Sequence, residues 1–265
     1  MAGLGLATVA VATAAAAPPP AAVSCLECHP SHYASDGGCV DCHRGDARAS
    51  RPALAHHRLL GGAAAAWGLP ASPVLVRAVA LRDSLGCRRC HVTGGKGERL
   101  AIDLDSVVWA RTQAELRQAL MHPAQAMPDF GLGATVADTL VAVLLRDGDR
   151  FGGASRYQVR FRAGSEDSLQ AFAKLCGGCH QALTRDGRQG VGTAGPNLSG
   201  LLGPFYPAPP DSAWNPERLE RWLRNPRAMR AGATMPPVAL KPGELDAVLR
   251  SLAHPTPAAP AAPER

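Results

Sequence analysis

All eight cysteines of the chain occur as pairs separated by two residues, and a histidine directly follows each pair. In chain order the four motifs are Cys25-Leu-Glu-Cys28-His29, Cys39-Val-Asp-Cys42-His43, Cys87-Arg-Arg-Cys90-His91 and Cys176-Gly-Gly-Cys179-His180. Two thiols on one turn can bond covalently to the same molecule, and the adjacent imidazole can ligate a metal ion held within it. The sequence therefore predicts the same chemistry at four places.

Paired cysteines also occur in disulfides, zinc sites and redox-active dithiols, but these fit the pattern less well. Disulfides require no histidine after the second cysteine, and zinc sites combine two cysteine pairs or add distant histidines. A thioredoxin-like dithiol would occur once, in a βαβ context. Cys-x-x-Cys-His is the attachment sequence of c-type haem (heme c), in which the thiols bind the porphyrin vinyl groups and the histidine is the proximal iron ligand. We therefore expect four covalently bound haem c groups, with His29, His43, His91 and His180 as proximal ligands.

The composition is compatible with such cofactors. The 265 residues carry a formal charge of +6, which would ordinarily indicate an acidic partner. Each haem adds two propionates, however, and four haems remove this excess. The basic residues are 25 Arg and 3 Lys, and Arg pairs bidentately with carboxylates. The arginines are counter-ions for propionates or reflect codon usage, and neither origin supports nucleic-acid binding.

The first residues resemble an export signal. Residues 3–17 form an apolar run, and Ala15-Ala16-Ala17 fits a small-x-small cleavage site. Residues 1–24 are thus expected to be a signal peptide or, alternatively, a retained N-terminal anchor. Haem c is attached on the outer side of the energised membrane, so a periplasmic or extracellular location is expected, with membrane association through the N-terminus as an alternative.

The remaining chain is expected to divide into three modules, a linker and a tail. The segments are an N-terminal dihaem module (25–70), a middle haem module (71–150), an extended linker or short strand (151–164), a C-terminal haem module (165–254) and a disordered Pro/Ala-rich tail (255–265).

The middle and C-terminal modules repeat one order of elements. Each begins with a helix that runs into its motif, and Ser72-Pro73 and Ser165 supply helix N-caps. A second helix, a Met-Pro pair and an amphipathic closing helix follow. The second helices are marked by Leu116, Leu120 and Pro123 and by Leu219, Leu223 and Pro226; the Met-Pro pairs are Met127-Pro128 and Met235-Pro236; the closing helices are expected around Thr135–Leu145 and Pro242–Leu252.

This order closely resembles the class I cytochrome c fold. The predicted fold class is therefore mainly α, with little strand, and organised by haem: a loop-rich dihaem module followed by two cytochrome c-like helical domains. In that family the Met after the second helix is the sixth iron ligand, which implies Met127 and Met235. The resemblance also implies that the Pro196 carbonyl accepts the His180 N–H. The middle module lacks the corresponding Gly-Pro, and the acceptor for His91 stays open.

The N-terminal module has no Met after Met1 and resembles a bis-histidine dihaem unit of multihaem cytochromes. Its candidate distal ligands are His32, His56 and His57. His32 lies close to His29 in the chain and is expected to cross to the second haem. A helix beginning at Pro52 carries the other two, of which we favour His56. Which iron each serves is left open.

The remaining histidines, methionines and tryptophans have simpler structural roles. His122 and His254 are expected to be exposed, Met121 and Met229 to lie in the core or on the surface, and Trp109, Trp214 and Trp222 to pack in the core or against haem.

The candidate distal ligands supply all four sixth positions, which leaves no iron site open to a substrate. The sequence thus predicts an electron carrier, not an enzyme, that connects redox proteins of a respiratory chain: cytochromes, a quinol-oxidising complex or a terminal reductase. The alternative is a haem enzyme, such as a peroxidase or oxyanion reductase, with one open axial site in the N-terminal module.

Overall fold

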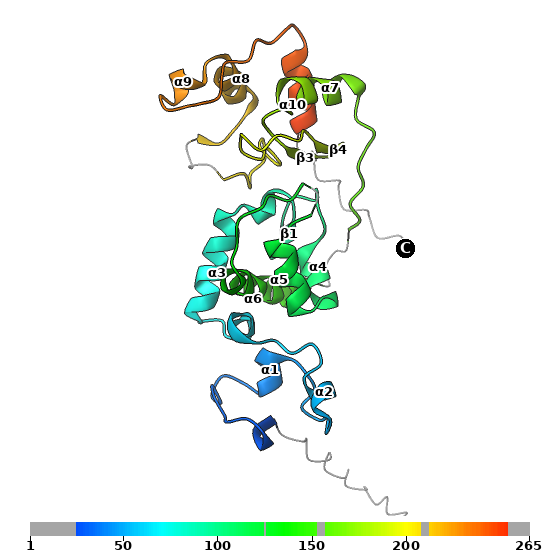
Figure 1. Cartoon of the computed structure of the whole chain (residues 1–265), viewed down its shortest axis with the longest axis vertical. Helices are drawn as coiled ribbons and strands as arrows, with labels where there is room; N and C mark the ends of the chain where they lie inside the picture. Colours follow the sequence, from blue (N-terminus) through cyan, green and yellow to red (C-terminus); the bar gives the residue numbers. More distant parts are fainter. Residues whose placement is uncertain (1–24, 125, 153–156, 208–211, 254–265) are drawn as a thin grey trace, which may run out of the picture.

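The computed structural model describes residues 25–124, 126–152, 157–207 and 212–253. Helix accounts for 46% of them and strand for 5%, so the expected mainly α class is confirmed. Figure 1 shows the three modules following one another along the long axis of the molecule. The signal or anchor at 1–24, the tail at 255–265 and His254 lie outside the described residues.

The N-terminal module begins with three short helical segments joined by loops. They are η1 (Cys25–Glu27), α1 (Cys39–His43) and α2 (Pro52–Ala55). Proline occupies the first position of α2, where its missing N–H has no cost. No residue from 25 to 59 is buried. This segment therefore has no hydrophobic core of its own.

The middle module is organised around its closing helix, α6 (Ala134–Phe151). Five elements pack beside it: η2 (Gly62–Gly68), α3 (Pro73–Ser84), α4 (Leu104–Val107), η4 (Val108–Ala110) and α5 (Gln113–Met121). The segment that opens the third motif, η3 (Cys87–Arg89), packs against α3. The expected Ser72 cap is present, with its side chain accepting from the Val74 N–H. Thr112 and Glu115 form a capping box on α5.

The core of this module reaches back beyond the boundary expected at residue 70. Leu60 is 1% exposed and packs in one apolar cluster with Val108, Val141 and Leu145. Three alanines of η2 are buried, and Ala66 lies in a second cluster. The packing therefore groups residues 60–68 with the middle module.

Helix α6 is longer than the sequence indicated. The expected helix ended near Leu145, where the apolar pattern stops, but the structure continues it to Phe151. Asp147 lies on the buried side of these last turns because it forms an ion pair with Arg82. Because a polar residue occupies the buried face there, the apolar periodicity of the sequence stops before the helix does.

The described part of the C-terminal module contains α7 (Glu166–Leu175), α8 (Pro216–Arg224), α9 (Pro226–Met229) and α10 (Glu244–Leu252). The expected Ser165 cap accepts from the Ser168 N–H. Phe172, Leu219, Leu223 and Val248 are buried in one cluster, which joins α7, α8 and α10.

A small antiparallel hairpin follows the third and the fourth motif directly. The strands are β1 (Val92–Thr93) with β2 (Lys96–Gly97) and β3 (Ala182–Thr184) with β4 (Gly187–Gln189). A Cβ at Gly97 would lie 1.9 Å from the His91 carbonyl oxygen, and one after β4, at Gly190, would lie 2.1 Å from that of His180. Glycine therefore closes each loop over its histidine.

The described part of the expected linker, residues 157–164, forms neither helix nor strand. Tyr157 ties it to the middle module by donating to the Ala101 carbonyl at 2.7 Å. Within the described ranges no single helix has the length and apolar character to cross a membrane; η2 and α3 pass that test only as a pair bent by 97°.

Candidate functional site

Three of the four motif histidines have the same hydrogen-bond arrangement. Their Nδ1 atoms lie 2.7–2.8 Å from backbone carbonyl oxygens: His43 with Leu60, His91 with Ile102 and His180 with Pro196. A carbonyl can only accept, so each Nδ1 carries the proton and each Nε2 keeps a free lone pair. This is the tautomer of a metal-binding histidine held by an outer hydrogen bond.

These bonds show which carbonyl groups accept from His180 and from His91. The hydrogen bond between His180 and Pro196 is present as expected. For His91 the sequence indicated no acceptor, and the structure assigns Ile102. Burial lowers the pKa of His91, while the Ile102 carbonyl opposes that shift. The neutral imidazole, which is the form that ligates metals, is thereby favoured.

Glycines let the backbone approach the motifs closely. A Cβ at Gly195 would lie 2.2 Å from Cε1 of His180, and one at Gly68 would lie 2.7 Å from Sγ of Cys42. The Gly195 N–H also donates to the Cys179 carbonyl at 2.8 Å. Any larger residue at 195 would displace the imidazole, so this loop is shaped around the histidine.

All eight thiols are free of disulfides. Burial raises the pKa of Cys87 and of Cys176 to about 11, and it also raises the pKa values of Cys42 and Cys90. These thiols are therefore protonated at neutral pH. Reactive redox cysteines have the opposite property, a lowered pKa, so a dithiol oxidoreductase site is disfavoured.

The N-terminal histidines lie in two pairs. The ring centroids of His32 and His43 are 5.5 Å apart, and those of His29 and His56 are 6.0 Å apart. His32 thus meets the second motif, as expected from its position, and His56 meets the first. Imidazole nitrogens bind metals at about 2 Å, so two rings on one metal ion have separations of this order.

The two candidate methionines occupy different surroundings. Met235 packs against the cluster that contains Cys176, and its Sδ accepts from the Trp222 indole N–H at 3.0 Å. Met127 is half-buried in the turn after α5, where its N–H donates to the Ala124 carbonyl. His122 is exposed, as expected from its position at the end of α5. Met121 and Met229 are both half-buried. Trp109 and Trp214 pack against apolar clusters, as expected.

A clasp of Trp67, Arg44 and Trp109 joins the second motif to the middle module, and sequence reasoning missed it. The Trp67 indole donates to the Cys42 carbonyl at 2.7 Å, and the two indoles meet edge to face at 5.7 Å. The Arg44 guanidinium carbon lies 3.8 Å from the Trp109 ring centre. Burial, followed by repulsion from Arg58, lowers the pKa of Arg44 to about 10. No local sequence signal links these residues.

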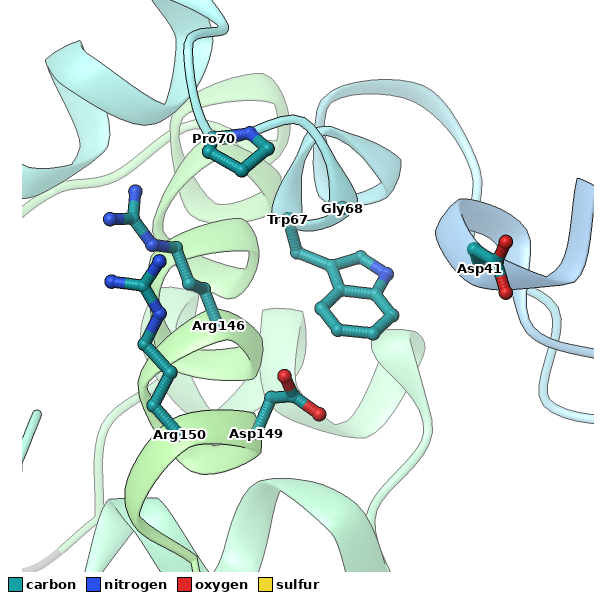
Figure 2. A pocket seen from close by; sticks show the side chains of 7 residues that line it. All are labelled: Asp41, Trp67, Gly68, Pro70, Arg146, Asp149 and Arg150. Carbon is teal, nitrogen blue, oxygen red and sulfur yellow. The ribbon is translucent and has the colours of Figure 1, made fainter. Parts of the chain in front are cut away.

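A cavity of about 300 Å³ lies beside this clasp, between α1, η2 and α6. Figure 2 shows Arg146 and Arg150 side by side on α6, with Asp149 directed towards Trp67. Two adjacent guanidinium groups are suited to carboxylates. Asp41 of the second motif and Asp149 line the same cavity, so its wall carries charges of both signs.

Comparison with known proteins provides no further guide. No family description, curated protein or solved structure matches the chain. The assignment of the four motifs therefore depends on the residues of the chain itself.

Proposed function

We propose that the chain is a tetrahaem c-type cytochrome that transfers electrons between redox proteins outside the cytoplasmic membrane. The observation that carries this proposal is the recurrence of one arrangement: at three of four identical motifs, the histidine that follows the cysteine pair donates through Nδ1 to a backbone carbonyl. A covalently held metalloporphyrin requires this combination of two thiols and an oriented Nε2.

The residues present fit the cofactor. Each cysteine pair would form the thioethers, and His29, His43, His91 and His180 would be the proximal ligands. His56, His32, Met127 and Met235 would fill the opposite positions in the same order. When bound, the haem groups supply reversible one-electron chemistry. The chain orients the imidazoles through Leu60, Ile102 and Pro196, and the helices of the two larger modules exclude water.

An electron carrier is favoured over a haem enzyme because a distal side chain is available for each motif. The haem-enzyme alternative requires an open iron site in the N-terminal module. The histidine pairs there favour a carrier instead, because each pair puts a second imidazole beside a motif histidine. Each transfer moves one electron from a reduced partner protein to an oxidised one, with no bond made or broken. Carbon monoxide binding tests the point: a fully six-coordinate ferrous protein binds almost none.

The covalent cofactors are tested on protein exported through a c-type maturation pathway. The intact mass should exceed that of the processed polypeptide by four haems, and the haem-to-protein ratio should be four. Replacing both cysteines of one motif by Ser should remove one haem and leave three. The control is Ser substitution of Thr139 and Thr135, which lie outside all motifs. Matured protein without covalent haem would overturn the proposal.

A further inference from the structure

The loop that holds the acceptor for His180 also contacts the neighbouring module. Directly after Pro196, the Asn197 side-chain amide donates to the Ala126 carbonyl at 3.2 Å. The Asn197 carbonyl accepts from Arg89 Nη1, also at 3.2 Å. Arg89 lies inside the third motif, and Ala126 directly precedes Met127. One residue of the C-terminal module is therefore bonded to both sides of the candidate site in the middle module.

The packing around these bonds is close. Ser199 is fully buried, and its side chain lies close enough to the Cys90 thiol to oppose the rise in pKa that burial causes there. Gly200 has φ +68°, and a Cβ there would lie 2.7 Å from the Arg89 carbonyl oxygen. The Tyr206 hydroxyl donates to the Asn197 carbonyl at 3.3 Å, and its ring lies beneath the Arg89 guanidinium. The loop consequently has little freedom to move independently of the third motif.

The Asn197 side chain also shapes its own loop. Its Oδ1 accepts from the Ser199 N–H at 3.0 Å, which forms an Asx turn. The amide oxygen thus fixes the loop that presents Pro196 to His180, while the amide nitrogen fixes the segment that presents Met127. A displacement of either segment strains a bond to the other.

We infer that Asn197 is a positioning residue shared by the third and fourth haem sites, and that it couples the His180–Pro196 bond to the placement of Met127. This inference rests on the proposed function, because that function makes His180 and Met127 iron ligands. Its consequence is that a change in one module alters iron ligation in the other.

The coupling can be measured on the matured full-length protein. In a Met235→His background, the sulfur-to-iron charge-transfer absorption reports Met127 alone. Asn197→Ser keeps a hydroxyl that can accept from residue 199 but is too short to reach Ala126. Loss of this hydrogen bond should lower the temperature at which the absorption disappears by about 4–8 °C.

Asn225→Ser is the matched control. Asn225 also lies in the C-terminal module, where its Oδ1 accepts from the Ala228 N–H as the cap of α9. It should leave the Met127 absorption unchanged. If Asn197→Ser behaves like this control, the inference is wrong, although the haem content of the parent would still support the proposed function.

The reciprocal experiment covers the case in which Asn197→Ser fails to mature. Arg89→Gln, in a Met127→His background, removes the guanidinium bond to the Asn197 carbonyl. The remaining absorption then reports Met235, in the other module, and its thermal loss should shift in the same direction. An unchanged Met235 absorption and reduction potential would overturn the coupling. A parent protein without either absorption would instead contradict the proposed function.

Discussion

The Trp222 indole donates a hydrogen bond to the sulfur of Met235 at 3.0 Å. Alignment of Leu116 and Leu219 in the two repeated helices places Ala119 opposite Trp222. Alanine has no side-chain donor, so the helix repeat offers this bond to one methionine and not to the other. The two proposed His/Met sites therefore differ in the electron density available at sulfur.

We expect Trp222→Phe to lower the reduction potential of the fourth haem. The indole N–H withdraws electron density from sulfur, which disfavours the ferric ion, and its removal restores that density. A bond of about 1 kcal/mol corresponds to at most about 40 mV for one electron. Spectroelectrochemical titration measures the shift. Trp214→Phe is the control, because Trp214 packs edge to face on Trp222; an equal effect from both changes would contradict the prediction.

Two methionines, Met127 and Met235, should ligate iron. Met127→His and Met235→His are each expected to halve the near-infrared charge-transfer absorption of the ferric protein. Met121→Leu and Met229→Leu should leave it intact, since neither matches its counterpart in the repeat. Loss of the absorption in Met229→Leu would show that the two repeats are wrongly aligned.

The ring pairs of the N-terminal module predict a contrast between two adjacent histidines. His56→Ala should open one axial position and allow about one equivalent of carbon monoxide to bind the ferrous protein, because His56 lies beside His29. His32→Ala should do the same at the second motif. His57→Ala should bind none. If the His57 variant binds carbon monoxide and the His56 variant does not, His57 is the ligand and the prediction is wrong.

The reduction potentials should rise from the N-terminal module to the other two. Thioether sulfur stabilises ferrous iron more than a second imidazole does, and burial disfavours the additional ferric charge. The segment from 25 to 59 has no buried residue, whereas helices enclose the other motifs. Electrons should then enter near His29 and His43. Reduction of the bis-histidine signals at the higher potential would reverse this direction.

The buried ion pair of Arg82 and Asp147 should contribute to the stability of the middle module. The two side chains are 5% and 11% exposed, and Thr93 donates to the same carboxylate. Asp147→Leu leaves Arg82 paired with the half-exposed Asp83 alone and removes the acceptor of Thr93. It should therefore cost about 3 kcal/mol in denaturant unfolding, the low end for breaking a buried ion pair. Arg82→Met combined with Asp147→Leu should recover most of that loss; a double variant as unstable as the single one would argue against it.

Local signals in the sequence predicted much of the fold. Ser72 and Ser165 cap their helices because capping depends on residues adjacent in the chain. The Pro196 carbonyl was expected to accept from His180 because the residues around it resemble a loop of class I cytochrome c. Ile102 as acceptor and Trp67 as donor to Cys42 could not be predicted, because each depends on tertiary packing that brings separate loops together.

The absence of buried residues between 25 and 59 also bears on how the protein is made. A short segment without apolar burial has no hydrophobic free energy to offset the conformational entropy of ordering its backbone. Under the proposed function, its order would come from covalent attachment to the haem groups and from docking on the middle module. If the proposed haem groups are attached, cofactor ligation and folding become one event for this segment, and both motifs would reach the attachment machinery as an unfolded chain.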